Sequence, residues 1–219
     1  ITRDNLKRMV AVTGRISGRD MGSTLKDIRA ALDHGRLIPK ALYYELGGLY
    51  QQQQIAFHGL LAVIIAAIVL VFLLLLFLYE RFLVAASILT IPLLAMLAVF
   101  IGLWVTGTEL NITAMMGMTM VVGIVIEVAI FYFSEYFFLV VTGVPPRRAL
   151  IEAGANRMRP IAMTTLAAIL ALSPLALGLG QGAAMQQPLA IAIIAGLTVQ
   201  LPLVLIFMPV LYGRVAGVR

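Results

Sequence analysis

Cysteine is absent from the 219 residues of this chain, so the chain can form no disulfide and no thiolate-bound metal site. Histidine is almost absent as well: His34 and His58 are isolated, and no His, Asp and Glu residues have the spacing of a metal site. The sequence also lacks a glycine-rich nucleotide-binding loop and a nucleophile–base arrangement. We therefore expect neither an enzyme nor a bound cofactor or metal.

Charge is scarce too. Charged residues make up 12% of the chain, whereas 62% is hydrophobic and the mean hydropathy is +1.03. Soluble domains are roughly 45–50% apolar. The apolar excess lies after residue 56, which predicts a small water-exposed segment at 1–56, a membrane domain at 57–212 and a tail at 213–219.

The net charge of +6 does not indicate a nucleic acid partner. Of the 16 Lys and Arg residues, nine lie in 1–56 and the other seven lie at the ends of apolar runs, where membrane topology requires them. The chain begins with Ile1, and no charged stretch leads into a short apolar one. We therefore expect no signal peptide and interpret the sequence as a piece of a longer protein.

Five apolar runs are long enough to cross a lipid bilayer. Each has about 20 residues or more, which at 1.5 Å per residue spans roughly 30 Å of hydrocarbon. We place these spans at 57–78, 82–104, 110–137, 160–179 and 188–212. Glycines within them are expected to let neighbouring helices approach closely: Gly102, Gly117, Gly123 and Gly196.

The connections between the spans differ in charge. Loops 105–109 and 180–187 hold no Lys or Arg, whereas the other connections and the tail hold seven. Because cytoplasmic loops are enriched in Lys and Arg, loop 138–159 and the C-terminus are predicted to be cytoplasmic, and residues 1–56 periplasmic. Within the cytoplasmic loop, residues 145–156 (PPRRALIEAGAN) are predicted to form a short interfacial amphipathic helix.

Residues 1–56 carry the signals of a small βαβ segment. Strands are predicted at Leu6–Ile16 and Ala41–Leu46. Between them we predict a helix that is capped by Ser23 or Thr24 and ends near His34. Because so short a unit cannot bury a sufficient core, we expect partner strands from outside this sequence. The predicted fold class is thus a membrane all-α bundle of five transmembrane helices preceded by a βαβ segment.

Glu127 lies in the middle of the third span. A carboxylate at the centre of a membrane helix costs roughly 2.5–3.5 kcal/mol on insertion scales. The residues on its helical face, including Met120, Gly123 and Ser134, are smaller or more polar than the opposite surface. We therefore predict that the carboxylate faces other helices rather than lipid and handles protons. The alternative is that Glu127 only hydrogen-bonds a neighbouring helix.

The fourth span begins with RMRPIAMTTL, which places Arg157 and Arg159 at its cytoplasmic mouth and Thr164 and Thr165 further inside. Such arginines are often only topological anchors, and membrane threonines often bond their own helix. A methionine cluster in the third span suits Cu(I), but consecutive methionines face different sides, which favours core filling. The cluster is Met115, Met116, Met118 and Met120.

The chain resembles the C-terminal membrane half of a resistance-nodulation-division efflux pump over essentially its whole length. The motifs that carry the resemblance are LNITAMMGMTMVVGIVIEVAI, RMRPIAMTTLAAILALSPLALG and AMQQPLAIAIIAGL followed by PVLY. The resemblance implies a homotrimeric inner-membrane proton antiporter whose chain has twelve spans in two similar halves. It also implies a periplasmic adaptor and an outer-membrane channel as partners. Residues 1–56 would then be the end of a periplasmic porter region.

The resemblance also implies a proton relay. Glu127 stands where drug exporters of this family often have a lysine, and some heavy-metal members are similar to this chain in having an acid there. Arg157 and Thr164 match the relay arginine and threonine, while the partner aspartates belong to a half that is not in this sequence. The cargo, whether drug, metal ion or other solute, is left open. Two alternatives are a protein-export accessory of the same superfamily and a passive half without relay chemistry.

Overall fold

The computed structural model describes residues 3–4, 7–8, 10, 12–14, 21–34, 44, 49–180 and 182–217. They fall into two compact units, residues 1–52 and residues 53–219.

The described residues of the first unit include two short strands and the helix α1. Strands β1 (Arg3–Asp4) and β2 (Lys7–Arg8) pair antiparallel. Only β2 lies within the strand predicted at 6–16, since residues 10 and 12–14 are not strand. The second predicted strand, at 41–46, lies outside the described residues apart from Tyr44. The βαβ segment therefore stays a prediction.

Helix α1 runs from Met21 to His34. Its end agrees with the sequence prediction, but it begins two residues before Ser23, the earlier of the two predicted caps. Its apolar face is poorly covered, with Ile28 41% exposed. After the helix, the Tyr44 hydroxyl donates a hydrogen bond to Asp33 Oδ1 (2.5 Å), which raises the pKa of Tyr44.

The described residues of the second unit are largely helical, and five helical segments among them are long and apolar enough to cross a membrane, which confirms the number of predicted spans. The first four are α2 (Leu49–Tyr79), α3 (Phe82–Val105), α4 (Ile112–Val141) and α5 (Pro146–Ala176). The last span consists of α6 (Ala183–Pro202), a π-helical stretch η1 (Leu203–Phe207) and α7 (Met208–Val215).

Helix α5 differs from its sequence prediction. Residues 145–156 were expected to form a separate interfacial helix before a span beginning at Pro160. Instead, one helix runs without interruption from Pro146 through Pro160 to Ala176. A proline inside a helix removes one backbone hydrogen bond without necessarily ending the helix. The amphipathic segment is therefore the first part of the span helix.

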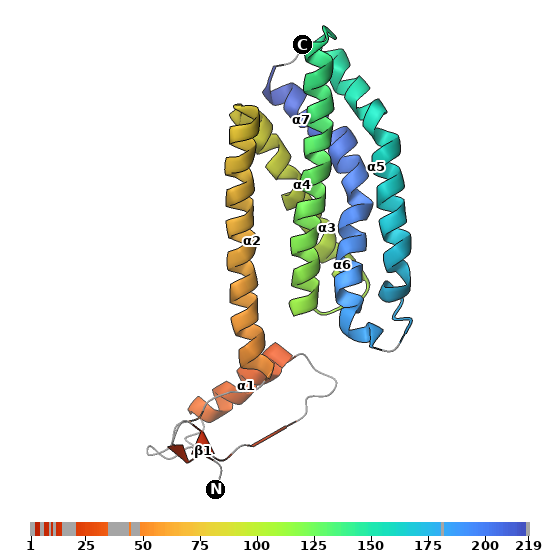
Figure 1. Cartoon of the computed structure of the whole chain (residues 1–219). Coiled ribbons are helices and arrows are strands. Elements are labelled where there is room, and N and C mark those ends of the chain that lie inside the picture. The colour runs from red at the N-terminus through yellow and green to blue at the C-terminus, as the bar shows by residue number, and fades with distance from the viewer. Residues whose placement is uncertain are drawn as a thin grey trace. The chain divides into compact units, whose positions relative to one another are not determined.

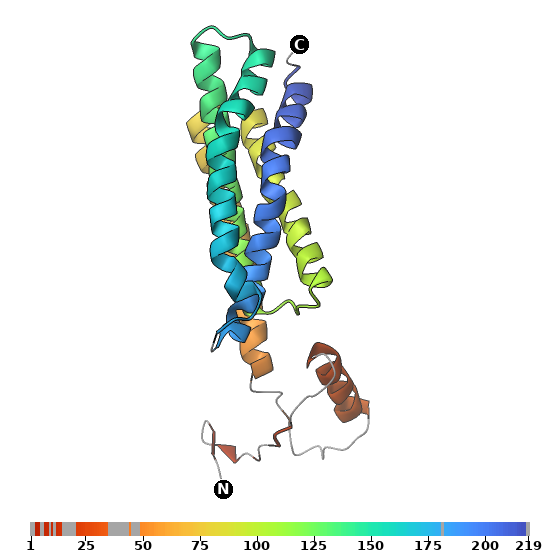
Figure 2. The same cartoon turned by 90° about the vertical axis from the view of Figure 1, so that its right-hand side faces the viewer.

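Helices α4 and α6 form the centre of the bundle, and α3 and α5 pack against them (Figures 1 and 2). Close approach depends on glycine, as predicted at three positions. A Cβ atom at Gly196 would lie 2.5 Å from Val121 Cγ1, and one at Gly102 would lie 2.5 Å from Ala195 Cβ. A Cβ atom at Gly117 would lie 2.9 Å from the Leu189 carbonyl oxygen. Gly123 is different, because its Cβ position has no neighbour within 4 Å.

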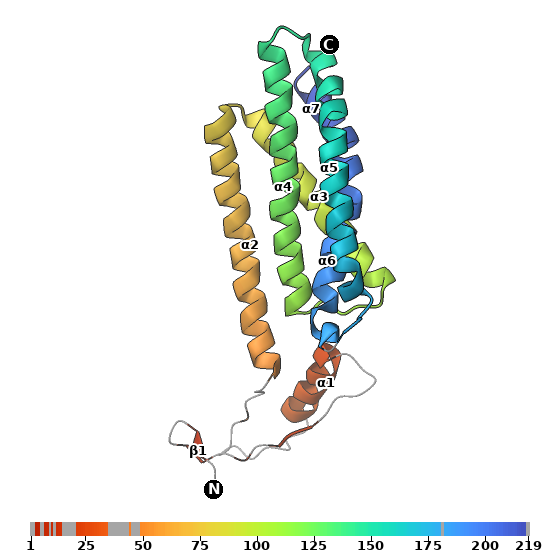
Figure 3. The same cartoon turned by 45° about the vertical axis from the view of Figure 1, so that its right-hand side comes forward.

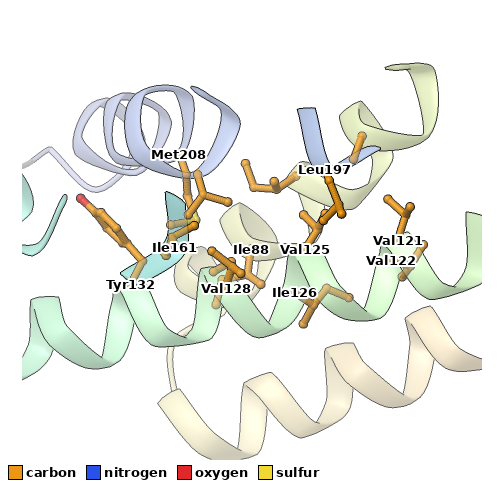
Figure 4. Close-up of a cluster of buried hydrophobic side chains, with 14 of the residues drawn as sticks. Ile88, Val121, Val122, Val125, Ile126, Val128, Tyr132, Ile161, Leu197 and Met208 are labelled. Carbon is orange, nitrogen blue, oxygen red and sulfur yellow. The ribbon is translucent and has the colours of Figure 1, made fainter. Parts of the chain in front are cut away.

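The buried core follows one side of α4. Figure 4 shows side chains along this helix that meet Ile161 of α5, Leu197 of α6 and Met208 of α7. At the end of this row, the buried hydroxyl of Tyr132 donates a hydrogen bond to the Leu150 carbonyl oxygen (2.6 Å), which ties α4 to α5.

The α2–α3 turn, the α4–α5 turn and the C-terminal end of α7 lie at the same end of the bundle (Figure 1). Aromatic rings gather there: Tyr79, Phe133, Phe137, Tyr136 and Tyr212 are in ring contact. The guanidinium of Arg81 lies 5.6 Å from the ring centre of Phe137. The chain connections at the opposite end are the ones without Lys or Arg.

Candidate functional site

Glu127 lies on α4 and is exposed, as are Met116, Met120 and Gly123 on the same side of the helix. The sequence predicts that this stripe faces other helices, but the described helices of this chain leave these positions uncovered. No residue in the described ranges hydrogen-bonds or pairs with the Glu127 carboxylate. The acid thus lies at an open edge of the bundle rather than inside it.

A hollow of about 350 Å³ lies between α4, α5 and α6, and we name it the polar hollow. It brings together all three residues predicted as a proton relay, because Glu127, Arg157 and Thr164 each line it. Two further polar residues, Thr165 and Gln200, also line it. The remaining lining is apolar: Ile124, Val128, Phe131, Pro160, Ile161, Ala168 and Leu197.

Arg157 pairs with a carboxylate other than Glu127. Its Nη2 donates to Glu135 Oε2 at 2.8 Å, while Asn156 Nδ2 donates to Glu135 Oε1 at 2.9 Å. The pair is partly buried, since the Glu135 side chain is 17% exposed and that of Arg157 is 34% exposed. Glu135 follows Glu127 by eight residues, or roughly 12 Å along the helix axis. It therefore holds the arginine about two turns closer to the end with the charged loops.

The two threonines near the middle of α5 differ. Thr164 is exposed, and its hydroxyl donates to carbonyl oxygens of its own helix, Pro160 O at 3.2 Å and Ile161 O at 3.0 Å. This hydroxyl can still accept a hydrogen bond. Thr165 is 3% exposed, and its hydroxyl has no hydrogen-bond partner among the described residues. Of these two residues, only Thr165 is buried and has a hydroxyl without a hydrogen-bond partner among the described residues.

Glu135 and Gln200 are not among the site residues that the sequence predicts. Gln200 lies on α6, is 1% exposed, and its Oε1 has no hydrogen-bond partner among the described residues. A signal for it existed, because an amide inside an apolar span is costly unless it is satisfied. The sequence indicates a role for Glu135 less clearly, because an acid near the end of a span is usually a solvated residue.

A second hollow, of about 290 Å³, lies between α2 and α4. Glu127 and Phe131 line both hollows, so the carboxylate lies at the boundary between them. The rest of its lining is almost wholly apolar, with Ile64, Ala67 and Val71 on α2. Helix α2 contacts α4 near the charged end, where the Tyr79 hydroxyl donates to Ile130 O at 3.2 Å. Figure 3 shows α2 and α4 running side by side along most of their length.

The methionines of α4 divide between two sides of the helix. Met115 and Met118 are buried in the core, whereas Met116 and Met120 are 47% and 55% exposed. The alternation agrees with the expectation that consecutive methionines face different sides. No group of three or more His, Cys, Asp and Glu residues gathers in the part of the chain that the structure describes.

Comparisons with known proteins all indicate the same family. The model of the AcrB/AcrD/AcrF family matches residues 1–216. The nickel and cobalt resistance protein CnrA of Cupriavidus metallidurans is 32% identical over 215 residues, which are 98% of this chain and 20% of that protein. The cobalt-zinc-cadmium resistance protein CzcA of the same organism is 31% identical over 97% of this chain and 20% of its own length.

Two further comparisons extend this result. The swarming motility protein SwrC of Bacillus subtilis is 32% identical over 95% of this chain and 20% of its own length. The crystal structure of a heavy metal efflux pump is similar with a TM-score of 0.79 and 29% identity, over 92% of this chain and 20% of that one. The chain thus spans about one fifth of the length of the relatives it matches.

Proposed function

The chain belongs to the AcrB/AcrD/AcrF family of resistance-nodulation-division efflux transporters, and on that premise we propose that it is part of a proton-driven exporter. In this proposal the five spans are the last five of the full chain and belong to the half that converts proton movement into transport. The protein is a secondary active transporter and needs no cofactor besides the proton motive force.

One observation carries the proposal: an acid in the middle of a membrane helix lines a hollow together with a cation and hydroxyl groups. Glu127 would take up and release the proton. Arg157 would set the local positive potential, and Thr164 would pass hydrogen bonds along the wall. Glu135 supports this arrangement, because its ion pair fixes the arginine at the mouth of the hollow.

The exposed side of α4 that carries Glu127 indicates that another segment packs against it. An exposed carboxylate at mid-membrane would cost roughly 2.5–3.5 kcal/mol if it faced lipid. We infer that the N-terminal half of the same protein covers Glu127 and its neighbours Met116 and Met120, and that it carries the carboxylates that share the proton. The assembled protein would be a homotrimer that works with a periplasmic adaptor and an outer-membrane channel.

For the cargo we propose a divalent heavy-metal cation. Two of the relatives are named for resistance to nickel, cobalt, zinc or cadmium, and the similar crystal structure is that of a heavy metal efflux pump. Full-length transporter in vesicles should then move Co²⁺, Ni²⁺ or Zn²⁺ against a gradient when protons flow the other way. If the transporter moved an organic drug and none of these metals, the proposed metal cargo would be wrong. The proposed coupling of transport to proton flow would still stand.

The test of the relay is Glu127→Gln in the full-length transporter. The amide keeps the shape but cannot carry a proton, so cargo-dependent proton flow should fall by about 100-fold. Glu109→Gln is the matched control, because Glu109 is an exposed acid in the loop before α4, and it should leave the rate unchanged. Unaltered, proton-dependent transport in Glu127→Gln would support the passive-half alternative instead.

We also propose that the end of the bundle with Arg147 is cytoplasmic and that residues 1–56 are periplasmic. The test uses single cysteines at Thr108 and Arg147, in a background without other cysteines. An impermeant thiol reagent added to intact spheroplasts should modify Thr108→Cys only, and Arg147→Cys should react only after the membrane is opened. Modification of both from outside would refute the orientation.

A further inference from the structure

Glu80 has an unusual backbone conformation in the turn between α2 and α3. Its φ angle is +50°, which lies in the left-handed region that side chains other than glycine rarely adopt. Every other residue with a positive φ in the described ranges is a glycine. Glu80 is therefore the one described position at which a side chain is held in this conformation, at a cost in free energy.

The other helix ends show that glycine suits this position. Helices α3, α4, α5 and α7 are each followed within two residues by a glycine whose φ lies between +63° and +94°. Glycine is common there because it has no Cβ atom to clash with the backbone. These glycines are Gly107, Gly143, Gly178 and Gly217. A glycine would also serve the α2–α3 turn better, so the reason for a glutamate lies in its side chain.

The charge of Glu80 is unfavourable at this place as well. The C-terminal end of a helix carries a partial negative charge and favours basic neighbours, but α2 has no basic residue in its last turn. The Glu80 side chain is exposed, and no residue in the described ranges forms an ion pair with it. The guanidinium of the next residue, Arg81, lies instead over the ring of Phe137.

Both neighbours of Glu80 are held on α4. The Tyr79 hydroxyl donates to Ile130 O at 3.2 Å, and the Tyr79 ring contacts Phe137. Arg81 lies 5.6 Å from the centre of the same Phe137 ring. The turn therefore presents the Glu80 carboxylate from a fixed place, at the end of the bundle where the α4–α5 turn also lies (Figure 1). A group that is already fixed loses little conformational entropy when it binds a partner.

A fixed, exposed carboxylate of this kind fits a basic side chain. Phosphates of anionic lipids carry the same sign of charge and would repel it. A metal site needs further ligands, and no group of three or more His, Cys, Asp and Glu residues gathers within the described ranges. Most of the length of the matched relatives has no counterpart in this sequence, since the chain spans about one fifth of them.

We infer that Glu80 forms an ion pair with an arginine or lysine in the part of the same polypeptide that lies outside this sequence. The pair joins the α2–α3 turn to that part of the protein at the end of the bundle with the charged loops. The turn lines neither of the two hollows beside Glu127. The contact is therefore one of assembly, and it depends neither on proton coupling nor on the cargo.

The first experiment measures hydrogen exchange in the full-length transporter. Glu80→Gln removes the charge and keeps the backbone conformation. Exchange should become about two- to fivefold faster around residues 76–84 and in one further peptide, outside this sequence, that contains an arginine or lysine. Both increases should largely disappear at about 1 M salt, which screens exposed ion pairs. Glu109→Gln is the matched control, because Glu109 is also an exposed acid but has no positive φ, and it should leave both peptides unchanged.

The second experiment uses Glu80→Gly to separate the backbone from the side chain. If Glu80 had no partner, glycine would relieve the unfavourable conformation, slow exchange in the turn and change nothing elsewhere. With the ion pair, the remote peptide should exchange faster by the same factor as in Glu80→Gln. Remote peptides that exchange at the wild-type rate in both variants would overturn the inference.

A charge exchange then identifies the partner. Glu80→Arg should speed exchange in the remote peptide at least as much as Glu80→Gln does. Replacing the basic residue of that peptide by glutamate in the same molecule should bring exchange back to within about twofold of the wild type. If no basic residue of the peptide gives this rescue, the ion pair is wrong. The relay role of Glu127 is unaffected by either result, because it is judged by proton flow.

Discussion

Replacing Glu135 by glutamine should loosen the contact between α4 and α5. The carboxylate accepts two hydrogen bonds, from Arg157 Nη2 at 2.8 Å and from Asn156 Nδ2 at 2.9 Å. Glutamine keeps one acceptor oxygen and turns its NH₂ group toward a donor, so one charge-assisted bond is lost. Such bonds contribute about 1.5–3 kcal/mol when buried. Because Arg157 is 34% exposed, solvent screening lowers the expected loss to about 1–2 kcal/mol.

Hydrogen exchange of the full-length transporter measures this loss directly. A local destabilisation of 1–2 kcal/mol corresponds to about 5- to 30-fold faster exchange. The increase should appear in peptides from the first half of α5, around residues 150–159. The double variant Glu135→Gln with Arg157→Gln should exchange little faster than either single variant, because both changes remove the same interaction.

The chain supplies a matched control for this experiment. Arg148 Nε and Glu152 Oε1 lie 2.7 Å apart on α5, but their side chains are 74% and 35% exposed. An exposed pair four residues apart on a helix contributes only about 0.3–0.5 kcal/mol. Glu152→Gln should therefore change exchange by no more than about twofold. Equal effects of Glu135→Gln and Glu152→Gln would refute the assignment of Glu135 as the partner that positions Arg157.

Two further substitutions probe the packing of the bundle. Gly196→Ala should destabilise the transporter by about 1–3 kcal/mol, because its Cβ would lie 2.5 Å from Val121 Cγ1. Gly154→Ala should be tolerated, since its nearest neighbour lies at 3.7 Å, and equal thermal unfolding of the two variants would contradict the close α4–α6 contact. Tyr132→Phe removes the buried bond to the Leu150 carbonyl and should speed exchange at the start of α5 by about fivefold; unchanged exchange would show that this bond contributes nothing.

The five spans could be predicted because each is a long apolar run bounded by turn residues or charge. The start of the fourth span could not, because the segment before Pro160 is polar enough to read as an interfacial helix. Proline at that position suggested a helix start, whereas the helix continues through it. Hydropathy predicts which residues lie within the membrane, but it does not predict where the helix that contains them begins.

The candidate site was predictable at the level of residue types and less so at the level of partners. Glu127 stood out because a charge is rare within an apolar span. Its separation from Arg157, and the pairing of Arg157 with Glu135, depend on how α4 and α5 align, which is a tertiary property. Which of Thr164 and Thr165 is buried could not be predicted for a related reason: neighbours on a helix are about 100° apart, and only packing determines which one is buried.

In the proposed mechanism, Glu127 binds and releases a proton during transport. Infrared difference spectra of the full-length transporter, recorded with and without cargo and a proton gradient, show the carbonyl band of any carboxyl group that becomes protonated. One component of this band should be present in the wild type and in Glu109→Gln and missing in Glu127→Gln. An unchanged band in Glu127→Gln, together with wild-type transport, would contradict this mechanism.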